Sequence, residues 1–184
     1  MTSNFGIGWR QVALSFVLLA AVAMIATSYS VLAVPLAQEF RPSRVVLMLA
    51  MTVLAGVSGL LAPFLGNLMD RFSLRHLMLA GTLMLAAGYA ALSLASTFTQ
   101  VLVIFGLFMA PANVLLGPVA VTVLLSRWFV KRRGRAIGIA VAGVAMGGVI
   151  FPPLIQWLLD SYEWRVALRV FSLIILVATV PAAA

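Results

Sequence analysis

One turn of the sequence carries charged side chains at a spacing that can do chemistry. Asp70 lies beside Arg71 and five residues before Arg75, and Gly66 stands one helical turn before Asp70. A carboxylate at a helix end accepts charge-assisted hydrogen bonds from guanidinium groups and interacts favourably with the positive N-terminus of a neighbouring helix. Such a cluster can hold one conformation of a protein against another. We therefore interpret these four residues as a conformational switch.

The other reactive side chains form no catalytic or metal-binding set. The sequence holds no cysteine, one histidine and four acidic residues. A thiolate nucleophile, a disulfide framework and a cysteine-ligated metal are therefore excluded, and His76 alone cannot build a metal site. There is no nucleophile triad, carboxylate pair or phosphate-binding loop. The sequence indicates that the protein is not an enzyme and needs no cofactor.

The sequence around this turn is too apolar for a soluble protein. Hydrophobic residues make up 64% of the 184 residues and charged residues 9%, against about 45–50% and about 25% in soluble domains. Four runs of 28, 25, 50 and 24 residues carry no charge, and about 20 residues suffice to cross a bilayer as a helix. These runs are apolar on every face, which excludes the alternating strands of a β-barrel. We predict an all-α membrane protein.

The long apolar runs set the number of spans. The 50-residue run must hold two helices, and the polar cluster at 96–100 is the predicted turn between them. A sixth apolar segment begins near Trp164 and ends at Pro181. We predict a single transmembrane domain over residues 1–184, with six helices near 10–34, 44–68, 77–95, 101–125, 136–158 and 165–181.

The basic residues fall unevenly on the two sides of this domain. One side holds eight of them and the other side holds four, together with three of the four acids. Loops rich in Lys and Arg stay in the cytoplasm, so we predict a multi-pass protein of the plasma (inner) membrane with both termini cytoplasmic. The net charge of +8 is then an orientation signal and a source of contact with membrane lipids, not a nucleic-acid site. The eight residues are Arg10, Arg71, Arg75, Arg127, Lys131, Arg132, Arg133 and Arg135, and the four are Arg41, Arg44, Arg165 and Arg169.

A few polar side chains lie inside the predicted spans. Tyr29 and Asn113 carry groups that lipid cannot satisfy, whereas Ser28 and Ser30 can bond to their own helix. Arg169 places a charge within a span, which makes it a functional candidate by default. The alternative for Arg169 is that its side chain reaches the nearby membrane surface. We predict Tyr29, Asn113 and Arg169 as residues of a substrate cavity.

Small residues recur at helical spacing in the fifth predicted helix. Gly134 and Gly138 share one face, as do Gly143 and Gly147, and small residues four apart let helix backbones approach closely. We predict these glycines as helix-packing positions. The pair Pro152 and Pro153 is expected to break or bend the same helix near its outer end.

The charged turn resembles a known sequence motif. Residues 66–76 read GNLMDRFSLRH and are similar to motif A of the major facilitator superfamily, G-x-x-x-D-R-x-G-R-[RK] or its spaced variant D-R-F-G-x-R. Gly66, Asp70, Arg71 and Arg75 match, and Ser73 stands where the pattern has Gly. The resemblance implies that the acid and its Arg neighbours brace the outward-facing state against a helix of a second six-helix half.

Four further segments resemble the monocarboxylate-transporter-like branch of that superfamily, which includes bacterial oxalate/formate-type carriers. Residues 128–147 follow the pattern W-F-x-x-R-R-G-x-A-x-G-I-A-x-A-G-x-x-x-G. Residues 162–167 are similar to G-W-R-x-A-F, with Glu163 in place of Gly, and residues 8–10 and 35–40 flank the first helix as in that branch. The resemblance covers the chain in order, but only the first six of the twelve helices of the family.

This resemblance implies a fold and a function. The chain is expected to be the N-terminal six-helix half of a major facilitator carrier, built from two three-helix inverted repeats. The expected activity is secondary active transport by alternating access of a small organic anion such as a monocarboxylate, as a proton-linked or exchange carrier. The expected partners are the small-molecule substrate with its coupled proton, membrane lipids, and a C-terminal six-helix half or a second subunit.

A second hypothesis stays open. In this alternative the six-helix chain is a truncated product, or a membrane interaction module that does not itself transport and needs a partner subunit.

Overall fold

The computed structural model describes the backbone of residues 3–183 and the side chains of residues 8–179. The described residues form helices and turns, with no strand among them. The helices are α1 Ser3–Phe40, α2 Arg44–Arg71, α3 Leu74–Leu92, α4 Phe98–Ile104, the π-helix η1 Phe105–Met109, α5 Ala110–Leu116, α6 Pro118–Trp128, α7 Arg133–Ser161 and α8 Trp164–Ala183.

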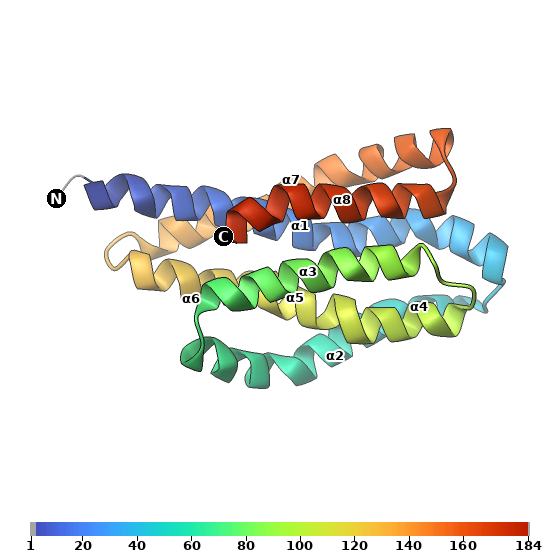
Figure 1. Ribbon diagram of the computed structural model, residues 1–184, viewed down its shortest axis with the longest axis horizontal. Coiled ribbons are helices and arrows are strands. Elements are labelled where there is room, and N and C mark those ends of the chain that lie inside the picture. Colours follow the sequence, from blue (N-terminus) through green and yellow to red (C-terminus); the bar gives the residue numbers. More distant parts are fainter. Residues whose placement is uncertain (1–2, 184) are drawn as a thin grey trace.

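These elements make an elongated bundle of rods (Figure 1). α4, η1, α5 and α6 follow one another as sections of one rod, so the described chain forms six rods that run side by side along the long axis. α1 packs along α7 and also contacts α8, α3 packs against α8 and α5, and α2 packs against α5.

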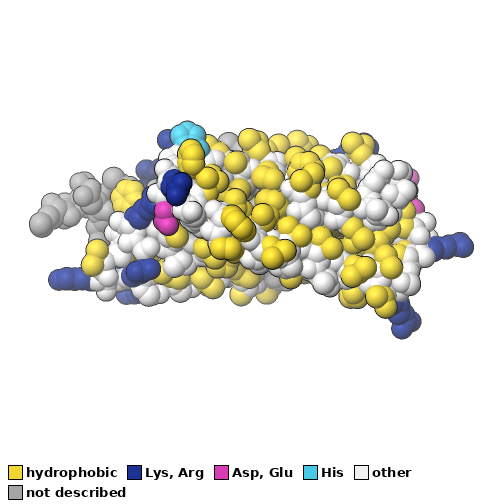
Figure 2. Space-filling model, turned by 90° about the horizontal axis from the view of Figure 1, so that it is seen from below, with side chains coloured by type: hydrophobic (Ala, Val, Ile, Leu, Met, Phe, Trp, Pro, Cys, Tyr) yellow, Lys and Arg dark blue, Asp and Glu magenta, His cyan; other side chains and the backbone are white. Residues whose placement is uncertain are grey.

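The turns lie at two opposite ends of the bundle, which differ in charge. The α2–α3 and α6–α7 connections lie at one end, here called the basic end, with the eight basic residues predicted to share a side. The other connections lie at the mixed end, with Arg41, Arg44, Arg165 and Arg169 and three acids. On the face shown in Figure 2, charged side chains gather at the two ends and the band between them is free of charge. That distribution suits a protein whose middle lies in hydrocarbon.

Helix length and composition support membrane crossing. Within the residues that the structure describes, four rods are long and apolar enough to span a bilayer: residues 8–40, 44–71, 98–128 and 133–161. α3 has 19 residues and α8 has 20, which at 1.5 Å per residue gives about 28–30 Å, close to the thickness of the hydrocarbon core. The all-α membrane fold is thus confirmed, whereas six crossings within one domain stay a prediction.

Prolines do not end the helices where the sequence suggested. α1 continues through Pro35 to Phe40, beyond the predicted end at 34. α7 runs uninterrupted through Pro152 and Pro153 to Ser161, so this helix does not break at the prolines, and a bend there stays a prediction. A proline removes one backbone donor, and a membrane helix tolerates that loss because the surrounding turns remain bonded.

The fourth rod is the irregular one. Pro111 lacks an N–H, and its ring would collide with a carbonyl of the preceding turn. The turn before it is widened into η1, in which the Ala110 N–H bonds to the Phe105 carbonyl five residues back. Further along the chain, the backbone of Gly117 is extended and α6 begins at Pro118. A Cβ on Gly117 would lie 2.2 Å from the Asn113 carbonyl oxygen, so this break requires glycine.

Candidate functional site

The charged turn lies exposed at the basic end. α2 ends at Arg71 and α3 begins at Leu74, and the side chains of Asp70, Arg71 and Arg75 are all exposed. Among the described side chains, Asp70 has neither an ion pair nor a hydrogen bond, since the one ion pair there joins Arg165 to Glu39 at the other end. The carboxylate therefore points to solvent and is free to accept bonds from another surface.

The structure brings one further basic residue to this turn. An Nη2–H of Arg127, at the end of α6, donates to the Met69 carbonyl at 3.1 Å. This bond caps a carbonyl in the last turn of α2 and fixes the end of α6 beside it. Ser73 hydrogen-bonds to His76 across the start of α3. Gly66 has nothing within 4 Å of the position of a Cβ, so its face of α2 is open.

The three predicted cavity residues each have a different hydrogen-bond partner. Tyr29 is 4% exposed, donates its hydroxyl to the Leu47 carbonyl and packs edge-to-face on Phe105. Asn113 is half-buried and donates an amide N–H to Ser58 Oγ at 3.2 Å. These two side chains therefore join α1 and α5 to α2.

Arg169 lies at the mixed end, in the second turn of α8. Its side chain is exposed, and its Nε–H donates to Ser93 Oγ at 3.4 Å. That geometry agrees with the alternative in which the side chain reaches the membrane surface. The assignment of the three residues to one substrate cavity stays a prediction.

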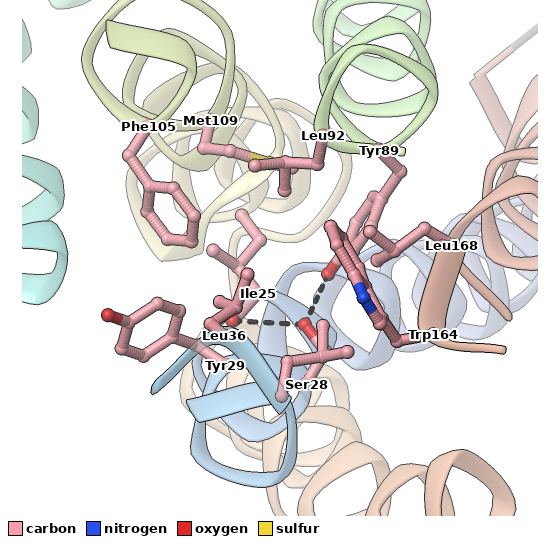
Figure 3. A pocket seen from close by; sticks show the side chains of 11 residues that line it. Ile25, Ser28, Tyr29, Leu36, Tyr89, Leu92, Phe105, Met109, Trp164 and Leu168 are labelled. Carbon is pink, nitrogen blue, oxygen red and sulfur yellow. Dashed lines mark hydrogen bonds between the residues drawn. The ribbon is translucent and has the colours of Figure 1, made fainter. Parts of the chain in front are cut away.

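A small, partly open cavity lined mainly by apolar side chains lies near the mixed end (Figure 3). Its volume is about 10 Å³, and α1, α3, η1 and α8 line it. The Ser28 and Tyr89 oxygens lie 2.8 Å apart in its wall, and the Ser28 hydroxyl also lies 3.2 Å from the Ile25 carbonyl. Tyr89 is 1% exposed and Ser28 2%. Tyr29 also lines the cavity, but Figure 3 shows its hydroxyl pointing away from Ser28 and Tyr89.

A second polar cluster, here called the Glu39 cluster, joins three rods at the mixed end. It consists of Glu39, Ser93, Trp164 and Arg165. Glu39 accepts from Trp164 Nε1 at 2.7 Å and from Arg165 Nη2 at 2.6 Å, and Arg165 Nη1 donates to the Ser93 carbonyl at 3.1 Å. The cluster ties the end of α1 to the start of α8 and to the turn after α3.

An open groove of about 640 Å³ lies beside this cluster, between α1 and the end of α7. Gln38, Asp160 and Glu163 line it together with Trp164. Gln156 donates to Asp160 at 2.8 Å across one turn of α7. No Lys or Arg lines the groove, so its electrostatic character is acidic.

The four predicted packing glycines divide into two pairs. A Cβ on Gly143 would lie 2.3 Å from the Phe16 carbonyl oxygen, and one on Gly147 would lie 2.6 Å from that of Ala20. These two glycines therefore let α7 lie directly on α1. Gly134 and Gly138 have nothing within 4 Å, so they face away from the bundle.

Two rods remain lightly buried. In the most apolar stretch, 17% of the residues of α2 and of α7 are buried, against 50% in α1 and 56% in 98–128. Exposed residues on α2 include Thr52, Gly56, Gly59 and Leu60, and those on α7 include Gly138, Ala142, Ala145 and Val149. Such small and apolar surfaces suit close contact with further helices or with lipid.

The Glu39 cluster and the Ser28–Tyr89 pair escape sequence reasoning. Ser28 alone gives no signal beyond self-satisfaction on its helix, and Tyr89 lies in an apolar helix like any core aromatic residue. Glu39 and Arg165 do carry a signal, since they have opposite charge and were assigned to the same side. Within the described residues, no group of three or more His, Cys, Asp or Glu residues could hold a metal ion.

Comparison with known proteins gives consistent matches. Residues 13–184 match the family model described as "Major Facilitator Superfamily". Monocarboxylate transporter 13 of Bos taurus is 29% identical over 167 residues, which cover 91% of this chain and 39% of that protein. The Fujikurins efflux protein of Gibberella fujikuroi is 37% identical over 116 residues, 63% of this chain and 25% of that protein. The MFS-type transporter dbaD of Emericella nidulans is 35% identical over 61% of this chain and 25% of that protein. The matches thus span a quarter to two fifths of the length of these relatives.

Proposed function

This chain belongs to the major facilitator superfamily, and we propose that it forms one wall of a secondary transporter that works by alternating access. In this proposal a second six-helix half, on the same polypeptide or on a partner subunit, forms the opposite wall. The solute binds between the two walls and crosses when they rock against each other. The family is one of transporters and not of enzymes, in agreement with the expectation from the sequence.

One observation carries this proposal: the exposed Asp70 side chain, which has no described partner, lies at the end of a rod with a largely open face. The open faces of α2 and α7 and the charged turn offer small residues, apolar side chains and a free carboxylate. A second bundle would cover these faces, and a cation or helix N-terminus on it would pair with Asp70. Loss of that pairing in one half of the cycle makes the turn a switch.

We propose a small organic anion such as a monocarboxylate as the solute, with a coupled proton or an exchanged anion. Support comes from the similarity to Monocarboxylate transporter 13 over 91% of the chain. Asn113 and Arg169 are accessible enough to take part in solute contact, as a hydrogen-bonding amide and as a cation. Tyr29 is closed off from the surface and would contact solute only after α1 moves.

The relatives also support a second candidate, in which the same fold exports its solute. The 37% identity with the Fujikurins efflux protein favours it. Flux driven by an imposed proton gradient in vesicles of known orientation separates the two candidates, because a proton symporter and a proton antiporter move the solute in opposite directions under the same gradient.

A transport assay tests the proposal. The 184-residue chain would be reconstituted in liposomes, alone and together with a separately expressed second half, and uptake of labelled short monocarboxylates measured. We expect no saturable uptake by the lone chain and recovery with the second half. Saturable uptake by the lone chain would favour a self-complementary dimer. No uptake in either case would favour the non-transporting interaction module.

The orientation with both termini in the cytoplasm is part of the proposal. The cysteine-free sequence allows single cysteines to be introduced at chosen positions. Cysteines at Ser73 and Ser126, and at Ser3, whose side chain lies outside the described range, should be shielded from an impermeant thiol reagent added outside. Cysteines at Ser43 and Ser161 should react. The opposite pattern would reverse the proposed topology.

A further inference from the structure

The connection between α6 and α7, residues 127–135, concentrates positive charge at the basic end. Five of its nine residues are Lys or Arg and none is Asp or Glu. Eight basic residues and one acid give the whole basic end a formal charge of +7, whereas four basic residues and three acids give the mixed end +1. Figure 1 shows the connection at the same end of the bundle as the α2–α3 turn. The five basic side chains of the connection are all exposed: Arg127, Lys131, Arg132, Arg133 and Arg135.

Two apolar side chains of the same connection are also exposed. Val130 is 90% exposed and Trp128 45%. Phe129, which stands between them in sequence, instead packs edge-to-face on Trp9. A loop that only sets the orientation of a membrane protein needs positive charge but no exposed apolar side chain. Exposed Trp and Val beside Lys and Arg are typical of a surface that enters the interface of an anionic membrane.

Contacts with the bundle fix where this connection lies. An Nη2–H of Arg127 donates to the Met69 carbonyl at 3.1 Å, which holds the end of α6 beside α2. α7 then begins at Arg133, with no acidic residue in its first turn. A Cβ on Gly134 would meet nothing within 4 Å, so the approach to this turn is open. The positive end of α7 therefore adds to the attraction that the basic side chains exert on an anion.

We propose that the α6–α7 connection is a binding site for an anionic phospholipid. The headgroup phosphate pairs with Lys131, Arg133 and Arg135, and Trp128 and Val130 lie among the glycerol and the upper part of the acyl chains. A soluble anion would leave the two apolar side chains in water, and a zwitterionic lipid would leave the positive charge uncompensated. The site lies within the described half of the bundle and needs neither solute nor a second half, so it goes beyond the proposed function.

The cysteine-free sequence allows the lipid beside this connection to be identified. Val130→Cys labelled with dansyl replaces one exposed apolar group with another. The purified 184-residue chain is placed in nanodiscs with phosphatidylglycerol or phosphatidylcholine that carries a nitroxide near the headgroup. Phosphatidylglycerol should quench the dansyl about fivefold more than phosphatidylcholine, the effect of one Lys or Arg near an anionic surface. Adding Lys131→Gln and Arg133→Gln together should bring this ratio close to one.

A second label position distinguishes a binding site from diffuse attraction of anionic lipid. Ser43 is an exposed turn residue at the mixed end, and Arg41 and Arg44 beside it are exposed as well. Dansyl on Ser43→Cys should be quenched almost equally by the two lipids, and Arg41→Gln with Arg44→Gln should change this little. Equal preference at the two label positions, no preference at Val130, or a preference that survives Lys131→Gln with Arg133→Gln would each overturn the proposal.

Trp128→Ala tests the apolar part of the site, because it leaves the charge unchanged. This substitution should lower the preference for phosphatidylglycerol at the Val130 label about twofold or more, since an indole at the membrane interface is lost. Trp157, 61% exposed at the other end of the same bundle, supplies the matched control, and Trp157→Ala should leave the preference unchanged. The unfolding midpoint of each variant should equal that of the parent, because every substituted side chain is exposed. Equal effects of the two Trp substitutions would contradict the anchoring role and overturn the site.

Competition with inorganic phosphate distinguishes a lipid headgroup from a free anion. Sodium phosphate and sodium chloride of the same ionic strength should lower the preference for phosphatidylglycerol equally, because both only screen the charges. A larger decrease in phosphate than in chloride would identify a soluble anion as the ligand and would overturn the assignment to a phospholipid.

Discussion

The carboxylates at the two ends of this bundle differ in whether they have bonding partners. At the mixed end, Glu39 is bonded to Trp164 and Arg165, and Arg165 reaches on to the Ser93 carbonyl. At the basic end, the Asp70 carboxylate has no partner among the described side chains although Arg71 and Arg75 are close in sequence.

This difference indicates that Glu39 stabilises the bundle itself, whereas Asp70 is available to bind another surface. A carboxylate that already holds two donors stabilises the rods it joins and has little capacity left for another surface. A carboxylate on an exposed turn contributes little to its own bundle and keeps that capacity. We therefore expect changes at the mixed end to affect stability, and changes at the basic end to affect the conformational cycle.

The largest effect on stability is expected from a change at the contact between α1 and α7, because α1 connects the two ends of the bundle. α1 reaches both ends and lies directly on α7 at Gly143. Gly143→Val should destabilise the chain by about 3 kcal/mol, because the new side chain meets the Phe16 carbonyl. The midpoint of thermal unfolding in detergent and the amount of protein in the membrane would measure this loss.

Gly138 supplies the control for that substitution. Gly138→Ala meets no neighbour within 4 Å and should be neutral or stabilise the 184-residue chain by up to about 1 kcal/mol, the usual preference for Ala in a helix. Destabilisation by Gly138→Ala equal to that by Gly143→Val would contradict the assignment of the two glycines to different faces.

The second effect tests the basic end. Asp70→Asn removes the charge and keeps the shape of the side chain. The full-length carrier should therefore reach the membrane in normal amount but transport about tenfold more slowly. A tenfold change lies within the range that typical coupling free energies produce. The unfolding midpoint of the 184-residue chain should not change. Normal transport by a normally inserted variant would remove Asp70 from the switch.

The third effect tests the mixed end. Glu39→Ala should lower the free energy of unfolding by about 1 kcal/mol, because the pair is partly exposed and solvent weakens such bridges. Glu39→Gln keeps an acceptor for Trp164 and should cost about half as much. Chemical denaturation of the 184-residue chain would measure both changes. A Glu39→Ala variant as stable as the parent would leave the bracing role without support.

The smallest effect is expected at the turn between α1 and α2. Arg41 has φ 45°, a left-handed conformation that disfavours a Cβ by about 1–2 kcal/mol. Arg41→Gly relieves this strain but adds freedom to the unfolded chain, so we expect a net stabilisation of about 0.5 kcal/mol. Arg41→Ala, which keeps the Cβ, serves as the comparison and should give no gain.

Much of the fold follows from the sequence because lipid imposes a simple rule. Uncharged runs of about 20 residues must be helical in hydrocarbon, and the all-α membrane fold and the membership of the major facilitator superfamily are both confirmed. Helix ends are less predictable. A proline ends a helix in a soluble protein more readily than a helix in a membrane, and α1 continues through Pro35 to Phe40. The widened turn before Pro111 depends on local backbone packing, which a pattern of residue types does not contain.

The site was less accessible to sequence reasoning than the fold. Asp70, Arg71 and Arg75 are neighbours along the chain, so their spacing alone identifies a charged turn. The contact of Trp164 with Glu39 joins residues 125 positions apart, and the pairing of Ser28 with Tyr89 spans 61. Such pairs depend on which rods are neighbours and on their rotation about their axes. Periodicity in one helix fixes neither.

The divided fourth rod has a mechanical consequence. α1 is a single helix of 38 residues that continues through Pro35, and an unbroken helix is expected to transmit a push or a twist along its length. Residues 98–128 instead form sections of 7, 5, 7 and 11 residues, with an extended glycine before the last. A displacement of the α3–α4 turn is therefore absorbed near Gly117 before it reaches α6. We therefore expect α1 to couple the two ends of the bundle mechanically, and the divided rod at 98–128 to couple them weakly.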